Sequence, residues 1–470
     1  MIDHGHGTTA ALTDAAGQHR HRPGGSRVLA GLTCYLVLLM AIPSSLVIGP
    51  LGAAGPLADV FAVFLFCWYV LARLHPATPV DTRRQPVRMA AAFFGCATVA
   101  SYVSANRTAL TTLVQNGSDR GLILLVGWLG VLLLAADGIG RADQLTTLLR
   151  RIVIGATAMS LLAIAEFFTG KTFAQYIVLP GLSVHAPVTD LIDRNGLFRP
   201  IATTAQPLEL TAVLLMSLPL AIHQARYASG RPSRLRLLRR WLPVALIGST
   251  LPMTGSRTAV LGLAVIIIVL FPSWPRRDRC RGCSVLLGGI ALCALADPAI
   301  LTSFGNLIGN IGSDTSISSR TAAYSSALPY IAHHPWLGQG FQTFYPQSYF
   351  FVDNQYLTSL IETGVVGLLA VVTLFVTGWF TAQSARWLAP SDQTRDQLQS
   401  LAASVAAAAV SFATFDALSF VIAPGLAFLM IGCVGAAWRL ARAGQLASPG
   451  EQPAAGAVPP ASYGTSRGNS

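Results

Sequence analysis

Apolar runs long enough to cross a lipid bilayer recur along the whole chain, and they constrain its fold more than any other feature. An α-helix needs roughly 20 apolar residues to cross about 30 Å of hydrocarbon. We identify twelve such runs, near residues 28–48, 57–73, 89–104, 120–136, 150–168, 207–225, 241–253, 257–272, 284–299, 357–381, 399–415 and 416–438. The seventh and eighth are short and nearly continuous. The sequence therefore predicts an all-α polytopic membrane protein with about twelve transmembrane helices.

The distribution of charge agrees with this interpretation. Charged residues make up only 11% of the chain, whereas soluble domains contain about 25%. If the amino terminus is cytoplasmic, 25 of the 32 Lys and Arg residues fall in segments on the cytoplasmic side. Such a bias is expected of membrane proteins, whose cytoplasmic segments are enriched in Lys and Arg. The net charge of +12 therefore indicates topology, with both ends cytoplasmic, and not binding to nucleic acid.

The composition divides the chain into three regions. Residues 1–27 are predicted to be a disordered cytoplasmic leader, residues 28–438 the membrane domain, and residues 439–470 a disordered cytoplasmic tail rich in Ala, Gly, Pro and Ser. Cys280 and Cys283 form a CxxC pair in a cytoplasmic segment. Because a structural zinc site usually needs a second pair of ligands, we expect two reduced thiols here and no metal.

One external loop, at about residues 300–356, is much longer than the other connections and joins the ninth and tenth spans. It contains a predicted helix whose repeated positions at i, i+4, i+7 and i+11 are Arg320, Tyr324, Ala327 and Ile331. We expect this helix to lie along the membrane surface and to direct Arg320 toward the protein. The loop ends at Asp353 and Asn354, directly before the tenth span, so it is predicted to carry the functional site.

Ionisable residues gather toward the predicted external face. Charged groups are costly inside a bilayer and usually face a cavity or a partner. The acidic ones are Glu166, Glu209, Asp297, Glu362 and Asp416, and the basic ones are Arg199, Arg257 and Arg320. Arginine forms paired hydrogen bonds with phosphate oxygens and stays charged at any relevant pH. The sequence thus predicts a cavity in which arginines bind a pyrophosphate. The alternative is that these residues are solvated or paired for structure, which we favour for Glu166 and Asp416.

Four motifs occur in a fixed order over roughly residues 195–375. They are FRPIATTAQPLE at 198–209, TGSRTA at 254–259, HPWLGQG at 334–340 after Arg320, and DNQYL at 353–357 followed by ETG at 362–364. This combination resembles the O-antigen ligase and polymerase superfamily of membrane glycosyltransferases. The resemblance implies a GT-C-like helical fold and transfer of a glycan from an undecaprenyl-pyrophosphate carrier, without metal or cofactor, on the external face of the cytoplasmic membrane.

The resemblance also implies roles for individual residues. Arg199, Arg257 and Arg320 would serve the donor phosphates, with Arg320 acting in catalysis. Further contacts to the substrates are expected from Gln206, Glu209, Tyr324, Asn354 and Glu362. The acceptor would be a saccharide, a lipid or a protein, with membrane lipid as the surrounding medium. Whether the protein is a ligase or a polymerase stays open.

This chain departs from the family where the family often has His-Asn, since it has Asp353-Asn354. The histidine is the usual candidate base, and an unperturbed aspartate, with a pKa of about 3.9, is a weaker one. Asp353 is nevertheless our first candidate for the base. Alternatives are that it orients a sugar hydroxyl, that His333 or His334 acts, or that another group does. A second departure is Gln206, where some relatives carry a histidine.

A secondary transporter with twelve spans is the rival interpretation. Twelve helices with both ends inside suit that class. However, no repeat relates the two halves of the sequence, and the ionisable residues collect at one face instead of near the middle of the membrane. A purely structural membrane anchor would not need arginines on the external side. The sequence therefore favours the glycosyltransferase.

Overall fold

The computed structural model describes residues 24–75, 85–107, 111–184, 193–194, 197–227, 233–296, 315–345 and 349–446. Nearly all of the predicted leader and tail, Asp297 and the first part of the long loop lie outside these residues. In the described part the protein is mostly helical.

Every predicted apolar run coincides with one helix. The first half of the bundle consists of α1 (Gly24–Ala41), α2 (Leu57–Leu74), α3 (Pro86–Ala105), α4 (Thr112–Gly138), α5 (Ala142–Thr169) and α6 (Pro207–Arg226). The second half consists of α7 (Arg234–Met253), α8 (Arg257–Leu270), α9 (Arg276–Ala296), α12 (Gln355–Trp387), α13 (Asp392–Phe412) and α14 (Ile422–Arg442). A further helix, α11 (Thr315–His333), lies in the long loop, where a surface helix was predicted.

The remaining elements are short and lie between these helices. They are the 3₁₀ turns η1 (Gly49–Ala54), η2 (Phe173–Tyr176), η3 (Phe271–Ser273) and η4 (Ala417–Ser419), and the strands β1 (Leu46–Ile48), β2 (Leu182–Val184), β3 (Asp193–Arg194) and β4 (Leu197–Phe198). β1 pairs with β2 and β3 with β4, both antiparallel. The β1–β2 pair joins the connection after α1 to the long connection before α6.

Local signals in the sequence explain where several helices begin and end. Pro86 and Pro207 occupy first helical positions, where the missing N–H is harmless. The Ser391 side chain accepts a hydrogen bond from the backbone N–H of Thr394 and so caps α13. Gly170 ends α5 in the left-handed conformation, with φ of 65°.

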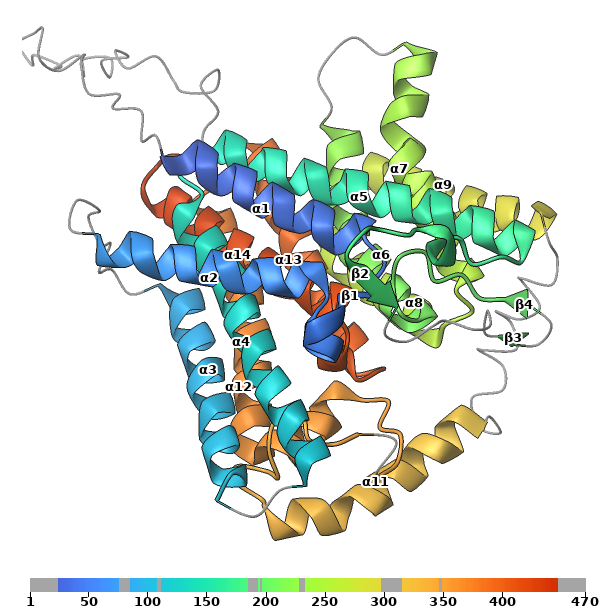
Figure 1. The fold of residues 1–470 in the computed structure, drawn as a ribbon. Coiled ribbons are helices and arrows are strands. Elements are labelled where there is room, and N and C mark those ends of the chain that lie inside the picture. Colours follow the sequence, from blue (N-terminus) through green and yellow to red (C-terminus); the bar gives the residue numbers. More distant parts are fainter. Residues whose placement is uncertain are drawn as a thin grey trace, which may run out of the picture.

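α14 is the central helix of the bundle and is buried along almost its whole length. It packs against α4, α12, α13 and α6, while α2 packs on α4 and α3 packs on α12. In Figure 1, α3, α4 and α12 run side by side, and α11 lies apart at the edge of the bundle near the start of α12. α11 is therefore held by the start of α12 and by the loop before it, where Tyr330 packs against Phe344 and Tyr349.

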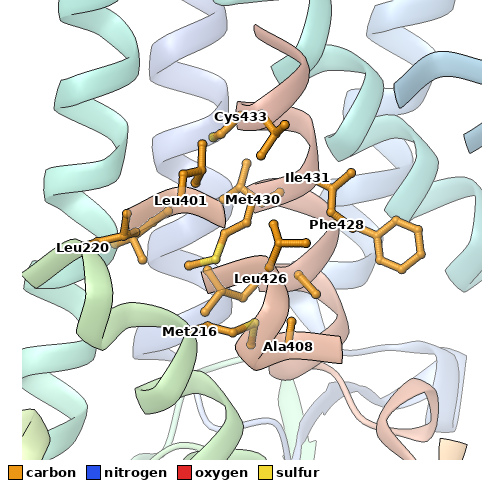
Figure 2. Packing of buried hydrophobic residues seen from close by; sticks show 14 of the residues in the cluster. Met216, Leu220, Leu401, Ala408, Leu426, Phe428, Met430, Ile431 and Cys433 are labelled. Atoms are coloured by element: carbon orange, nitrogen blue, oxygen red, sulfur yellow. The ribbon is translucent and has the colours of Figure 1, made fainter. Parts of the chain in front are cut away.

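The core around α14 is apolar and closely packed. Figure 2 shows α6 and α13 side chains interlocking with those of α14; the labelled residues are Met216, Leu220, Leu401, Ala408, Leu426, Phe428, Met430, Ile431 and Cys433. Burial of this kind is worth about 25 cal/mol per Å² of apolar surface removed from water, but in lipid much of the gain comes from close packing. α14 thus provides a rigid support for the helix ends around it.

Seven described helices are long and apolar enough to cross a membrane, namely α2, α3, α4, α5, α6, α12 and α14. Two shorter apolar helices, Gly25–Ala41 and Arg257–Ser273, add to them. α7 and α9 begin with several arginines and α13 with charged and amide residues, which lowers their mean hydropathy. The multi-pass membrane fold is supported, while the count of twelve spans stays a prediction.

Candidate functional site

The HPWLGQG and ETG motifs form one structural unit. The backbone of residues 335–340 runs against a kink in α12, with Val365 N donating to Pro335 O at 2.9 Å and Gly340 N donating to Glu362 O at 2.8 Å. Gly364 has non-helical dihedrals, with φ of 64°. A Cβ there would lie 2.3 Å from the carbonyl carbon of Trp336. The glycine is needed both for this conformation and for the close approach of the two backbones.

The Glu362 side chain holds the same loop from the other side. Its carboxylate accepts a hydrogen bond from Phe344 N at 3.1 Å, with the backbone N–H groups of Gln342 and Thr343 also directed at it. The residue is 3% exposed. The resemblance to the family implies that Glu362 contacts the substrate. In the structure its carboxylate is occupied by the loop backbone, which makes it a support of the site.

Asn354 and Tyr324 join the loop helix to the start of α12. The Asn354 side chain caps α12 by accepting from the backbone N–H groups of Tyr356 and Leu357, and its Nδ2 donates to the Tyr324 hydroxyl at 2.9 Å. Arg320 lies one turn before Tyr324 in α11, but its side chain is outside the described residues. The two predicted contact residues, Tyr324 and Asn354, are thus in direct contact with each other.

Gln355 fixes the position of Asp353 relative to the turn after α13. The Gln355 Oε1 accepts from Leu418 N at 2.6 Å, and Gln355 N donates to Phe415 O at 3.1 Å. Asp416 lies in that turn and interacts electrostatically with Asp353. Asp353 itself is exposed. Two carboxylates that are 63 residues apart in sequence therefore lie near one another at the start of α12.

Asp416 is the more enclosed of the two carboxylates. Its Oδ2 accepts a hydrogen bond from the Ser419 hydroxyl, and its Oδ1 is buried without a hydrogen-bond partner in the described part of the chain. Burial raises the pKa of Asp416 to about 6, while the charge of Arg120 lowers it and that of Asp353 raises it. The pKa of Asp416 is thus closer to neutral pH than that of an ordinary aspartate.

Arg199 lies against the TGSRTA motif. Its Nε donates to the carbonyl oxygen of Thr254 at 2.6 Å, and its side chain passes beside Gly255. Arg257, two residues further on, is the first residue of α8 and is half-buried. The structure therefore brings together Arg199 and the segment that carries Arg257. Thr258 in the same segment hydrogen-bonds to Thr414, close to Asp416, at 2.8 Å.

Two buried glutamates hold the segment before α6. Glu166 Oε2 accepts from the backbone N–H groups of Ile201 and Ala202, at 3.0 and 2.8 Å, which supports the unusual φ of 51° at Ala202. Glu209 Oε2 accepts from Ala205 N, and its Oε1 accepts from Ile422 N at the start of α14. Carboxylates are stabilised at helix N-termini in this way.

These contacts bear on two further predicted substrate residues. Glu209 is fully buried and engaged with backbone N–H groups, so its described contacts are structural. Gln206 precedes α6 as its half-buried N-cap residue, with no cap bond from its side chain. Its role toward a substrate stays a prediction.

Arg120 and Asp59 are two charged residues near the site that were not predicted to belong to it. Arg120 is half-buried in α4 and interacts electrostatically with Asp59, Tyr345 and Asp416. Asp59 lies in the first turn of α2 and is 2% exposed. A signal was present, because Asp59 falls inside a predicted apolar run, where an ionisable residue suggests a function.

Within the described residues no group of three or more His, Cys, Asp or Glu side chains has the arrangement of a metal site. Cys280 and Cys283 are exposed in the first turns of α9. The arrangement around Asp353 and Asp416 offers instead arginines that can bind anionic oxygens and carboxylates that can accept a proton.

Comparisons with known proteins point to one family. Residues 242–372 match the family described as O-antigen ligase. This region contains Arg257, Arg320, Asp353 and Glu362, but not Arg199 or Asp416. The chain is also 27% identical over 142 residues to a protein named O-antigen ligase from Pseudomonas aeruginosa, a match that covers 28% of this chain and 32% of that protein. The chain thus spans about a third of the length of the curated relative that it matches. Both matches support the resemblance to the O-antigen ligase superfamily that the motifs indicate.

Proposed function

We propose that this protein is a glycosyltransferase of cell-surface polysaccharide biosynthesis that moves a glycan from a polyprenyl-pyrophosphate carrier to an acceptor on the external face of the cytoplasmic membrane. The observation that carries the proposal is the gathering of Arg199 and the Arg257 segment beside the Asp416 turn, through the Arg199–Thr254 and Thr258–Thr414 contacts. The relative from P. aeruginosa is named as an O-antigen ligase, and the same chemistry is proposed here.

In the proposed reaction, an acceptor hydroxyl oxygen attacks the anomeric carbon of the donor sugar. The hydroxyl proton passes to a carboxylate, and the bond from the anomeric carbon to the pyrophosphate oxygen breaks. The carrier leaves as its pyrophosphate, and attack from the opposite side inverts the anomeric configuration. Guanidinium groups stabilise the negative charge that grows on the leaving oxygen. Arg199, Arg257 and Arg320 are assigned to this task, which requires no metal.

The proposed base is the carboxylate pair Asp353 and Asp416. Asp353 is exposed and stands where the family often has a histidine. It is suited to orient the acceptor hydroxyl. Asp416 is less exposed, and burial raises its pKa to about 6, which makes it a stronger base than an ordinary aspartate. The negative charge of Asp353 acts on Asp416 and contributes to raising its pKa.

The test uses membranes from a deletion strain that expresses variant proteins and receives lipid-linked glycan isolated from the same deletion strain. Arg199→Ala and Arg257→Ala should each lower transfer by about 100-fold or more, the effect typical of losing one oxyanion donor. The control Arg107→Ala removes an exposed arginine at the C-terminal end of α3 and should transfer normally. Full activity of both site variants contradicts the proposal, and so does proton-coupled solute uptake by wild-type vesicles without a glycan product.

A further inference from the structure

Two charged side chains near the proposed base carry polar atoms that the described protein does not satisfy. Asp59 is 2% exposed, and its Oδ2 is buried without a hydrogen-bond partner among the described residues. The Nε of Arg120 is buried and lacks an acceptor in the same part of the chain. Buried polar groups in proteins are nearly always hydrogen-bonded, so each exception asks for an explanation.

The packing of α2 on α4 directs these two side chains to the same place. A Cβ at Gly127 of α4 would lie 3.0 Å from the Ala62 side chain and 3.5 Å from the Asp59 carbonyl oxygen, so the helices nearly touch there. Arg120 precedes Gly127 by seven residues, two turns along the same face of α4. Since Gly130 meets Phe66 further along, the two helices run parallel, and Arg120 lies level with the residues just before α2. It interacts electrostatically with Asp59 in the first turn of α2.

The loop before α12 packs against α4 close to Arg120. Tyr345 packs its hydroxyl against Gly117 of α4 and interacts electrostatically with Arg120. Asp416 also interacts with Arg120 and lies toward the exposed Asp353. Exposure therefore decreases from Asp353 at the surface, through the half-buried Asp416 and Arg120, to the buried Asp59.

The nearby glutamates do not supply the missing hydrogen-bond partners of Asp59 and Arg120. Glu209 faces Asp59, but its oxygens accept backbone N–H groups at Ala205 and at the start of α14. Glu362 is likewise occupied by the loop backbone. Asp59 and Arg120 are left as one acceptor and one donor that interact electrostatically without forming an ion pair in the described structure. The Tyr35 hydroxyl, which also interacts with Asp59, likewise has no hydrogen-bond partner among the described residues.

We propose that Asp59 and Arg120 form a subsite for a hydroxyl group of the glycan, next to the proposed base. A hydroxyl accepts a hydrogen bond from Nε–H and donates one to a carboxylate, so it satisfies both groups at once. A phosphate is disfavoured because Asp59 and Asp416 flank the guanidinium, and a cation is disfavoured by the guanidinium itself. The subsite rests on the proposed function and adds to it a place that recognises neutral sugar, apart from the arginines assigned to phosphate.

Binding to the purified protein in detergent tests this inference with two probes, undecaprenyl pyrophosphate without sugar and the lipid-linked glycan that accumulates in the deletion strain. If the donor sugar occupies the subsite, Asp59→Asn and Arg120→Gln should raise the Kd for the glycan-bearing lipid about tenfold, the effect of losing roughly one good hydrogen bond. The Kd for the sugar-free carrier should change less than twofold. If the acceptor sugar occupies it, both Kd values stay unchanged and the KM for an acceptor polysaccharide fraction rises about tenfold.

Matched variants separate the subsite from general damage. Asp119→Asn and Arg107→Gln remove exposed charges nearby and should leave every constant unchanged. Arg120→Lys keeps the positive charge together with a donor, and it should retain more affinity than Arg120→Gln. The inference is overturned if the folded Asp59→Asn and Arg120→Gln variants change neither the glycan Kd nor the acceptor KM, or if they weaken both lipids equally. Failure of the proposed function differs from either outcome, because wild-type protein would then bind neither lipid.

Discussion

Asp353 and Asp416 lie close together in very different environments. Asp353 is exposed at the N-terminal side of α12, whereas Asp416 is half-buried and has a pKa raised to about 6. A base works best when its pKa is near the working pH, since it is then both ionised and basic. The residue that the family motif marks and the residue with the better protonation chemistry are therefore two different aspartates, and we assign the proton to the second.

The first prediction concerns pH. A protonated Asp416 cannot accept a proton, so the transfer rate should fall as the pH drops through about 6. Asp416→Asn should lower the rate by about 100-fold or more, and the residual rate should lose this acid limb. Asp353→Asn removes the negative charge that raises the pKa of Asp416, so the limb should move to lower pH. Rates measured between pH 5 and 8 check this.

Two results would contradict the assignment. One is an acid limb that persists in Asp416→Asn and vanishes in Asp353→Asn, which would make Asp353 the base. The other is a normal rate in Asp353→Asn together with a normal limb in Asp416→Asn, which would remove both aspartates from the chemistry.

At the scale of elements, the sequence predicts helices better than the contacts between them. Apolar runs mark all twelve bundle helices because a span must be long and continuous. The start of α13 was placed late, at residue 399, because polar residues follow its Ser391 cap. Glu209 is predicted to contact a substrate, and its described contact with Ile422 N joins residues 213 positions apart in sequence. Backbone N–H groups have no signature in a single sequence, so such carboxylate contacts cannot be predicted from it.

The second prediction concerns the join between the loop and α12. Gly364→Ala should prevent residues 335–340 from docking, because the new Cβ would meet the backbone at Trp336 in addition to adopting an unfavourable φ. We expect loss of transfer and a clear fall in the midpoint of thermal unfolding. Gly444→Ala is the matched control, since its φ of 67° is similar and nothing lies within 4 Å. That variant carries only the φ strain, of order 1–2 kcal/mol. Equal effects of the two substitutions would show that the backbone contact is unimportant.

At the scale of the whole molecule, the two ends of the bundle hold their carboxylates by different chemistry. The described ion pairs of Arg73 and Arg88 with Asp137, and of Arg226 with Asp396, lie at helix ends predicted to be cytoplasmic. At the opposite ends, Glu166 and Glu209 accept backbone N–H groups instead. The carboxylates of the predicted external end are thereby stabilised by backbone N–H groups.

The last prediction uses this polarity to test the topology. Twelve spans place the start of α1 and the end of α14 on the same side, whereas an odd number such as seven would place them on opposite sides. In a cysteine-free variant, single cysteines at Ser26, Gln393 and Gln445 should react with a membrane-impermeant maleimide only after the membrane is permeabilised. Cysteines at Thr112 and Ser326 should react in intact cells. All five positions are exposed in the structure, so a failure to react reports the membrane side and not burial.

If Ser26 and Gln445 reacted from opposite sides, the count of spans would be odd. If Thr112 and Ser326 were protected while Gln393 reacted in intact cells, Arg199 and Arg257 would face the cytoplasm. An external transfer site would then be impossible, even with the fold and the family unchanged.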